Sequence, residues 1–320
     1  MRKIKLGRTN CTVSSVSLGT WAFGGQNMNG KISVGWGGQN KNDSHESLKR
    51  AWELGINHWD TADVYGDGKS ESIIGEMWKS IPRNDIFIAT KLGWDKGPYS
   101  NWYNPKHMRE NFERSLKNLK VDCVDLLYLH HCNFGKNDFL LDDAIATIKK
   151  FQTEGKTRFI GLSDWSSKRI LKYIKECDPD VVQTYHNVMD NNYFTSGLKN
   201  YVDKNNLGVC FFSPIKHGLL TGKYREPATF DNGDHRSMIK EFQNLEILKK
   251  MRENKSLLEK RFNKKRNPVM HGLVNSLFSD SKTGCVLLGQ RDKKQVEVAA
   301  SLGETLSRED SAWVKELYSF

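Results

Sequence analysis

The sequence predicts an α/β protein with a closed (β/α)8 barrel, the TIM-barrel fold, preceded by an N-terminal β-hairpin. Three observations support this fold class. Short apolar runs alternate with amphipathic helices, which indicates parallel strands joined by crossover connections. Eight such units fit into about 300 residues, as in closed barrels. No GxGxxG turn follows any strand, which argues against the alternative, an open doubly wound sheet.

The repeating unit is an apolar strand, a polar loop and a helix. The predicted strands are Val16–Leu18, Ile56–Trp59, Ile86–Thr90, Val124–Leu129, Phe159–Leu162, Val181–Gln183, Val209–Phe212 and Cys285–Leu288. The predicted helices run from Asp43 to the residue before Gly55, and over Glu71–Lys79, Pro105–Leu119, Leu141–Glu154, Ser166–Glu176 and Ser196–Asn205. No stretch has the composition of a linker, so we expect one domain over residues 1–320.

Three segments stand outside this alternation. Residues Met1–Val13 read as a hairpin, and Thr20–Asn42 as a long loop rich in Gly and Asn. The segment Arg225–Asn267 follows the seventh strand and is polar and charged. Helical periodicity over Met238–Phe262 predicts that this segment is a loop followed by an accessory helix.

Composition limits the classes of function. The 320 residues are 38% hydrophobic and 27% charged, and no run approaches the roughly 20 apolar residues that span a bilayer. The N-terminus has no apolar signal-peptide segment. The six cysteines are scattered without a CxxC pair, which argues against a zinc or redox motif. We expect a cytoplasmic protein with no membrane partner and no metal.

The formal net charge of +11 raises the affinity for anions in general. An anionic cofactor or substrate explains this charge as well as DNA would. The basic residues are spread among acidic ones, and the densest cluster, Lys260–Arg266, is short and typical of a solvated helix end. The pattern therefore argues against nucleic acid as a partner.

Polar residues close the predicted strands. The set is Asp60, Lys91, His130, Ser163, Gln183 and Ser213. The carboxyl ends of barrel strands meet on one face, where active sites are built. One such residue alone is more often structural, but a ring containing an acid, an amine and an imidazole predicts a site.

The chemistry of this ring suggests proton transfer to a carbonyl oxygen. A buried Lys91 would pair with Asp60 and lower the pKa of Tyr65, which lies on the loop after the second strand. Tyr65 could then exchange a proton closer to neutral pH, and His130 could orient the same oxygen. A cofactor must supply the hydride, since no side chain can. The structural alternative is a turn-capping Asp60 and a packed Tyr65.

Further residues suit a dinucleotide. Ser163, Asp164 and Gln183 are short polar groups that could hold a carboxamide. The turn Ser213–Lys223 could hold a pyrophosphate through its backbone amides and Lys223. Arg291, just before a predicted helix, could pair with a 2′-phosphate.

Together these motifs resemble the aldo-keto reductase family over nearly the whole chain. The resemblance rests on Leu18-Gly19-Thr20-Trp21, Asp60-Thr61-Ala62-Asp63-Val64-Tyr65-Gly66, Ala89-Thr90-Lys91, Asp125-Leu126-Leu127-Tyr128-Leu129-His130, Gly161-Leu162-Ser163, Ser213-Pro214, Gly218-Leu219-Leu220-Thr221-Gly222-Lys223 and Leu288-Gly289-Gln290-Arg291. Each piece is weak alone, but their order and spacing together are specific. The resemblance implies a (β/α)8 barrel that binds NADPH, or NADH, and reduces a small-molecule carbonyl substrate.

The resemblance also implies residue roles. Asp60, Tyr65, Lys91 and His130 match the catalytic tetrad, with Tyr65 as general acid in reduction. The cofactor positions are Thr20, Trp21, Asp60, Ser163, Asp164, Gln183, Phe212, Ser213, Pro214, Ile215, Gly218, Lys223, Arg236, Gly289, Arg291 and Gln295. Phe212 matches the aromatic residue that stacks on the nicotinamide.

Some positions depart from the family pattern. Asp164 stands where many members have Asn, and an acid there could accept from the carboxamide NH2. Phe212 replaces a common Tyr or Trp and keeps the stacking. Val298 and Ala299 stand where members often carry Glu and Asn, which weakens the expected adenine contacts and leaves NADP versus NAD open.

The substrate would meet loop residues at the barrel mouth. The predicted substrate-binding residues are Trp21, Tyr65, Trp94, His130, His131 and Trp165, with Phe23, Trp36, Trp102, Tyr103 and Asn133 nearby. Indole faces beside Asn, Asp and His suit a sugar-like carbonyl compound. The alternative is that these aromatic residues only pack the loops together.

Two other functions fit the same motifs. The opening Leu18–Gln26 also resembles the voltage-gated potassium channel beta subunits, which share the fold and bind NADPH. A redox-neutral epimerase that retains its nicotinamide is the third possibility. Cys132, beside His130 and His131, is either reactive or packed.

Overall fold

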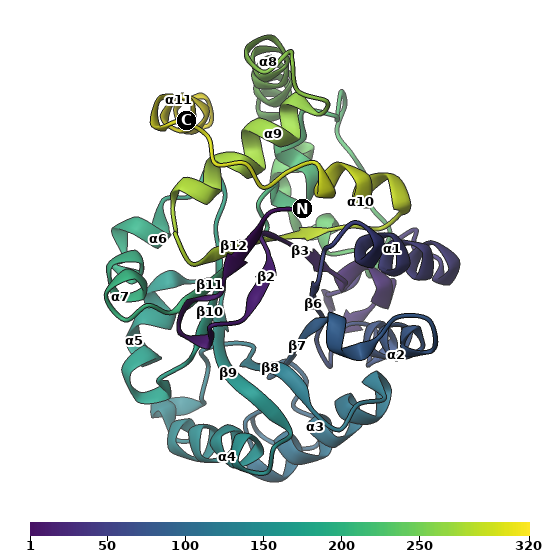
Figure 1. Ribbon diagram of the computed structural model, residues 1–320, viewed down its shortest axis with the longest axis vertical. Coiled ribbons are helices and arrows are strands. Elements are labelled where there is room, and N and C mark those ends of the chain that lie inside the picture. The colour runs from purple at the N-terminus through teal and green to yellow at the C-terminus, as the bar shows by residue number, and fades with distance from the viewer.

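The computed structural model describes residues 1–320 and contains a closed barrel of parallel strands in the order β10-β11-β12-β3-β6-β7-β8-β9. Figure 1 looks into this barrel, with helices arranged around it. The strands are β3 (Val16–Gly19), β6 (His58–Asp60), β7 (Phe87–Leu92), β8 (Val124–Leu129), β9 (Thr157–Asp164), β10 (Val181–Tyr185), β11 (Gly208–Phe212) and β12 (Gly284–Gly289). The predicted (β/α)8 fold is confirmed, with all eight strands at the predicted places.

A layer of helices covers the barrel (Figure 1). The helices are α1 (Lys41–Glu53), α2 (Lys69–Gly75), α3 (Pro105–Leu119), α4 (Leu141–Thr153), α5 (Ser167–Cys177), α6 (Asn192–Thr195), α7 (Leu198–Lys204), α8 (Leu245–Arg261), α9 (Pro268–Asn275), α10 (Lys293–Ala300) and α11 (Arg308–Leu317). Helix α3 shows why the boundaries are readable from sequence. The Asn104 side chain accepts from two first-turn amides, Pro105 fits the first position, and Lys120 ends the helix in a left-handed conformation.

The N-terminal hairpin closes the amino end of the barrel. Strands β1 (Lys3–Lys5) and β2 (Thr12–Ser14) pair antiparallel. Leu6 and Val13 are fully buried in a small core with barrel residues such as Leu126. The predicted hairpin is confirmed, and it leaves the opposite end of the barrel free for a site.

The predictions for the two long loops need correction. The loop Thr20–Asn42 contains a 3-10 turn over Trp21–Gly24 and a short hairpin of β4 (Met28–Asn29) and β5 (Ile32–Ser33). The accessory helix begins at Leu245, not at Met238. The Asn244 side chain caps it by accepting from the amides of Glu246 and Ile247, while 3-10 turns precede it.

Two smaller predictions were also inexact. The helix predicted over Glu71–Lys79 is α2 followed by a 3-10 turn, Met77–Lys79. The helix predicted over Ser196–Asn205 begins at Leu198, behind a left-handed Gly197. In both places local turn geometry interrupts a periodicity that looks continuous in the sequence.

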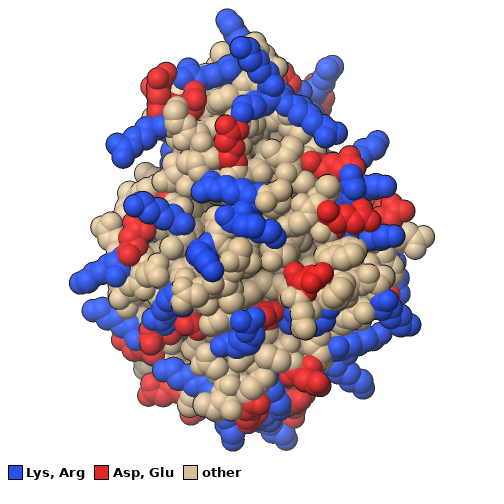
Figure 2. Space-filling view, viewed as in Figure 1, with Lys and Arg blue, Asp and Glu red and all other residues tan.

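Charged side chains are spread over the surface, with Lys and Arg next to Asp and Glu on the face that Figure 2 shows. At the end of α8, Arg261 pairs with Asp310 at 2.7 Å and Lys265 with Glu304 at 2.6 Å. Two of the five cations in the cluster Lys260–Arg266 are therefore paired with acids on the surface. No helix combines the length and hydrophobicity needed to cross a membrane. All six cysteines are free thiols.

Candidate active site

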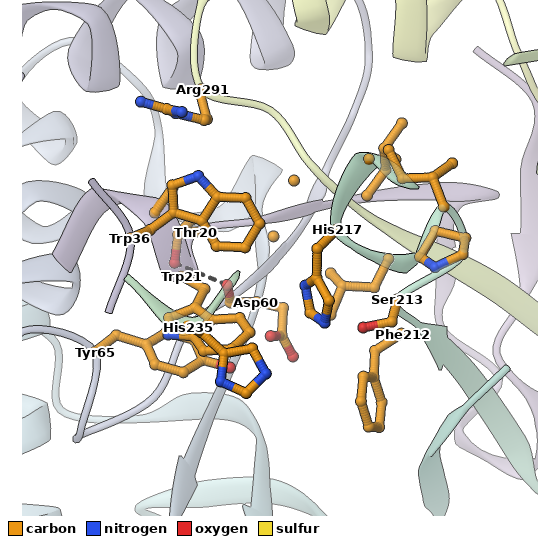
Figure 3. Close-up of a pocket in the computed structure, with 18 of the residues that line it drawn as sticks. Thr20, Trp21, Trp36, Asp60, Tyr65, Phe212, Ser213, His217, His235 and Arg291 are labelled. Atoms are coloured by element: carbon orange, nitrogen blue, oxygen red, sulfur yellow. Dashed lines mark hydrogen bonds between the residues drawn. The ribbon is translucent and has the colours of Figure 1, made fainter. Parts of the chain in front are cut away.

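A pocket of about 500 Å³ opens at the carboxyl ends of the barrel strands. Figure 3 shows residues from its wall. All the predicted site residues except Lys91 line it: Thr20, Trp21, Asp60, Tyr65, Trp94, His130, His131, Ser163, Asp164, Trp165, Gln183, Phe212, Ser213, Pro214, Ile215, Gly218, Lys223, Arg236, Gly289, Arg291 and Gln295. Lys91 lies beneath this wall and is fully buried.

Asp60, Lys91 and Tyr65 form the floor of the pocket. Asp60 ends β6 and Lys91 lies near the end of the neighbouring β7. The Lys91 Nζ is 2.5 Å from Asp60 Oδ1, and it donates to the Thr61 carbonyl at 2.6 Å and to the Tyr65 hydroxyl at 3.4 Å. The other Asp60 oxygen accepts from Gln183 Nε2 at 2.8 Å. Every donor of the ammonium therefore points at a partner, which a buried charge requires.

Two glycines bring the Tyr65 loop against the Trp21 turn. A Cβ on Gly24 would lie 2.6 Å from the Gly66 nitrogen, and Gly66 has a φ of +62°. Only glycine permits this approach. The contact places the Trp21 and Tyr65 rings in a stack, 5.9 Å between centroids. Nearby, the Thr20 hydroxyl donates to the Asp60 carbonyl at 2.8 Å, the dashed bond in Figure 3.

The charge states in the floor differ from the prediction in one respect. Burial raises the pKa of Tyr65 above its ordinary value, and the nearby Lys91 lowers it by less than burial raises it. The predicted net lowering of this pKa is therefore wrong, and Tyr65 stays a neutral phenol at neutral pH. Burial lowers the pKa of Lys91, but Asp60 and Tyr65 outweigh burial and raise it. The amine therefore stays charged.

Two stacked imidazoles follow β8. The rings of His130 and His131 lie 4.6 Å apart, and the His130 ring is 6.1 Å from that of Tyr65. Burial lowers the pKa of His130 well below its ordinary value and that of His131 to about 4. Both rings are therefore neutral at pH 7. His130 Nδ1 is buried without a hydrogen-bond partner, which favours the tautomer with the proton on Nε2.

The predicted carboxamide grip lies at the ends of β9 and β10, where Ser163 pairs in register with Gln183. Asp164 also accepts hydrogen bonds from the backbone of two loops. Its two oxygens accept from the Cys132 and Ser166 amides, each at 2.8 Å. Asp164 thus ties two loops together, and its oxygens keep acceptor capacity beside the Ser163 hydroxyl and the Gln183 carbonyl oxygen.

Cys132 is packed rather than reactive. Its side chain is buried 3.7 Å from the Ser163 carbonyl. Burial raises the pKa of this thiol well above its ordinary value. A thiolate, the reactive form, is therefore disfavoured here.

The other end of the pocket is basic and has room for an anion. A turn after β11 uses positive φ at Ser213, Lys216, His217 and Gly218. Nothing within 4 Å would meet a Cβ on Gly289. Four cations line this end of the pocket: Lys223, Arg236, Arg291 and Lys294. A pocket lined by short polar side chains and by four cations has the chemistry to hold a nicotinamide dinucleotide.

Two loops far apart in sequence meet above this basic end. The Asn27 amide donates to Gly233 at 3.1 Å, and the His235 amide to Gly35 at 3.0 Å. Asp234 accepts from the Gly37 amide at 2.8 Å and from Arg236 at 2.6 Å. Sequence reasoning missed this pairing, and with it His217 and His235 in the wall, because Gly-rich segments indicate loops but not their partners.

The predicted mouth residues divide into two groups. Trp21, Trp36, Trp94, His131 and Trp165 line the pocket. Phe23, Trp102, Tyr103 and Asn133 do not, and they belong to the loop packing that was the alternative interpretation. Tyr103 is fully buried, for example, and donates to the His131 carbonyl at 2.6 Å.

The profile of the Aldo/keto reductase family matches residues 15–319. The aldo-keto reductase YhdN of Bacillus subtilis is 29% identical over 317 residues, 97% of this chain and 91% of that protein. A putative voltage-gated potassium channel subunit beta of Schizosaccharomyces pombe is 29% identical over 69% of this chain and 64% of its own length. The structure of the glycerol dehydrogenase AKR11B4 from Gluconobacter oxydans superposes with a TM-score of 0.80 and 27% identity, covering 98% of this chain and 94% of that one.

Proposed function

The chain belongs to the aldo/keto reductase family, and from this premise we propose that it reduces a small aldehyde or ketone to an alcohol with NADPH. The observation that carries this proposal is the buried Asp60–Lys91–Tyr65 arrangement on the pocket floor. A phenol that keeps its proton at neutral pH beside a fixed ammonium is suited to acid catalysis.

Each group of the floor has a distinct task. A bound reduced nicotinamide supplies the hydride. The Tyr65 hydroxyl gives its proton to the carbonyl oxygen, and Lys91 stabilises the phenolate that remains. Asp60 compensates the Lys91 charge and keeps Nζ aimed at Tyr65. His130 donates from Nε2 to the same oxygen and orients it.

The cofactor would lie along the pocket from Tyr65 to Arg291, which Figure 3 shows at opposite ends. Ser163 and Gln183 would hold the carboxamide and Phe212 would stack on the nicotinamide ring. The turn at Ser213–Lys223 would take the pyrophosphate. Arg291, already positioned by Gln39 at 3.0 Å and the Gly37 carbonyl at 2.9 Å, would pair with a 2′-phosphate, which favours NADPH over NADH.

Fluorescence titration with NADPH and NADH tests this proposal, because four tryptophans line the pocket: Trp21, Trp36, Trp94 and Trp165. We expect tighter binding of NADPH. Arg291→Gln should weaken NADPH binding by about tenfold or more and leave NADH binding unchanged, since it removes one charge-assisted contact to the 2′-phosphate. The NADH titration of the same variant is the control, because damage to the loop that Arg291 supports would weaken NADH binding as well.

Each outcome assigns the protein to one functional class. Binding of neither nucleotide would exclude hydride transfer. Binding without turnover of any aldehyde or ketone would favour the regulatory role of a channel beta subunit. A nicotinamide that stays bound through purification without net turnover would favour an epimerase.

The rate of carbonyl reduction should be nearly independent of pH between about 6 and 9. The His130 pKa lies well below 6.5 and the Tyr65 pKa lies above 10, so neither group titrates in this window. The rate should fall above pH 10, because a deprotonated Tyr65 cannot act as an acid. Steady-state kcat/KM at saturating NADPH measures this profile, and a fall centred near pH 7 would contradict it.

A further inference from the structure

Charge is distributed unequally along the pocket. The phosphate limb, lined by Lys223, Arg236, Arg291 and Lys294, holds all of the pocket's Lys and Arg side chains. The substrate limb is lined by Trp21, Ile32, Tyr65, Trp94, His131 and Trp165, and has none. Ile32 belongs to this limb because its hairpin reaches the Trp94 carbonyl through Asn29 at 3.5 Å.

The imidazoles near the substrate limb do not supply positive charge. Burial lowers the pKa of His131 to about 4 and that of His217 to about 3, and it also lowers the pKa of His235. Lys91 is sealed beneath the floor and paired with Asp60. Asp164, the carboxyl group that follows Ser163 in the pocket wall, is an acid and not a cation.

Two of the three indole N–H groups in this limb, those of Trp21 and Trp94, are also withheld from a ligand. Trp21 Nε1 donates to the Val34 carbonyl at 2.7 Å. Trp36 Nε1 and Trp94 Nε1 are buried inside the protein and reach neither solvent nor pocket. An anionic group in this limb would lose part of its water, and no Lys or Arg that lines the limb and none of these donors would replace it.

We propose that the substrate limb selects uncharged carbonyl compounds and rejects aldehydes and ketones that carry a carboxylate. This inference rests on the proposed reductase function. The net charge of +11 does not reverse the selection, because surface charges are screened beyond about 8 Å in physiological salt. The anionic partner that this charge favours is the cofactor, which the phosphate limb receives.

A matched pair of aldehydes tests the selection: 4-formylphenoxyacetate and its primary amide. The two are nearly the same size, and the OCH2 link insulates the aldehyde from the terminal group, so their intrinsic reactivities match. We expect kcat/KM with NADPH to be about tenfold higher for the amide, because the carboxylate loses part of its water without gaining a partner. Equal kcat/KM values would overturn the proposal.

A charge-introducing variant tests the electrostatic origin of the selection. Ile32 is 44% exposed on the β4–β5 hairpin, so a lysine there is tolerated. Ile32→Lys should raise kcat/KM for the carboxylate about fivefold, the effect of a partly exposed ion pair. Ile32→Gln, the uncharged control, should leave the amide-to-acid ratio unchanged. An unchanged ratio in Ile32→Lys would overturn the proposal.

The same pair of aldehydes distinguishes the reductase function from the selection against carboxylates. Reduction of the amide but not of the acid supports both the reductase function and the selection. Reduction of both at equal rates removes only the selection. Reduction of neither removes the reductase function and the selection with it.

Discussion

The Tyr65→Phe variant is expected to lose carbonyl reduction by about 1000-fold in kcat, within the range that general acid catalysis contributes. Phenylalanine keeps the ring that stacks on Trp21 but has no proton to give. NADPH affinity should stay unchanged, since the substitution removes only a hydroxyl. Single-turnover kinetics with fluorescence titration measures both quantities on the same protein.

Tyr201→Phe on α7 is the matched control, because it deletes the same hydroxyl away from the pocket. We expect this variant to keep full activity. If Tyr65→Phe kept more than about a tenth of the normal kcat, a group other than Tyr65 would be the general acid. A variant that also lost NADPH binding would show that the substitution disturbs the pocket rather than the proton transfer.

Lys91→Met should have the second largest effect, on stability as well as on activity. Asp60 is 1% exposed and would be left as a buried charge without its counter-ion. Breaking a buried pair in this way typically costs about 3–5 kcal/mol. The floor would also lose the cation that stabilises the Tyr65 phenolate, so we expect kcat to fall by at least about 100-fold. Urea denaturation and steady-state kinetics measure the two effects.

The double variant Asp60→Asn/Lys91→Met separates folding from catalysis. It removes both charges, so most of the lost stability should return, because a neutral amide at position 60 needs no counter-ion. Activity should stay as low as in the single variant. If the double variant were as unstable as Lys91→Met, the stability loss would come from the packing of the lysine chain, not from the uncompensated charge.

The sequence by itself determined the barrel and the membership of the site. The strand runs, such as Val124–Leu129, are apolar over a short length and end in a polar residue, and this pattern is local. The carboxyl ends of parallel barrel strands lie on one face. The residues that close the strands therefore lie close together, independently of the conformation of the loops. The prediction therefore brought Asp60, Tyr65 and His130 to one pocket without any knowledge of contacts.

The tertiary structure decided what depends on burial and on contacts between distant residues. The sign of the Tyr65 pKa shift depends on how much desolvation outweighs Lys91, and a sequence does not show depth of burial. The hydrogen bonds from the Cys132 and Ser166 amides to Asp164 depend on how the loops after β8 and β9 lie against each other.

The loop pairing above the phosphate limb and the start of α8 also depend on contacts between residues that are distant in the sequence. Gly35 and Asp234 are about 200 positions apart, and only the closed barrel brings their loops together. The periodicity over Met238–Phe262 is compatible with a longer helix, but the Asn244 cap and the packing of the preceding turns end it early. Local pattern thus identifies the strands and their polar ends, whereas charge state and loop partners follow from desolvation and long-range packing that only the folded chain establishes.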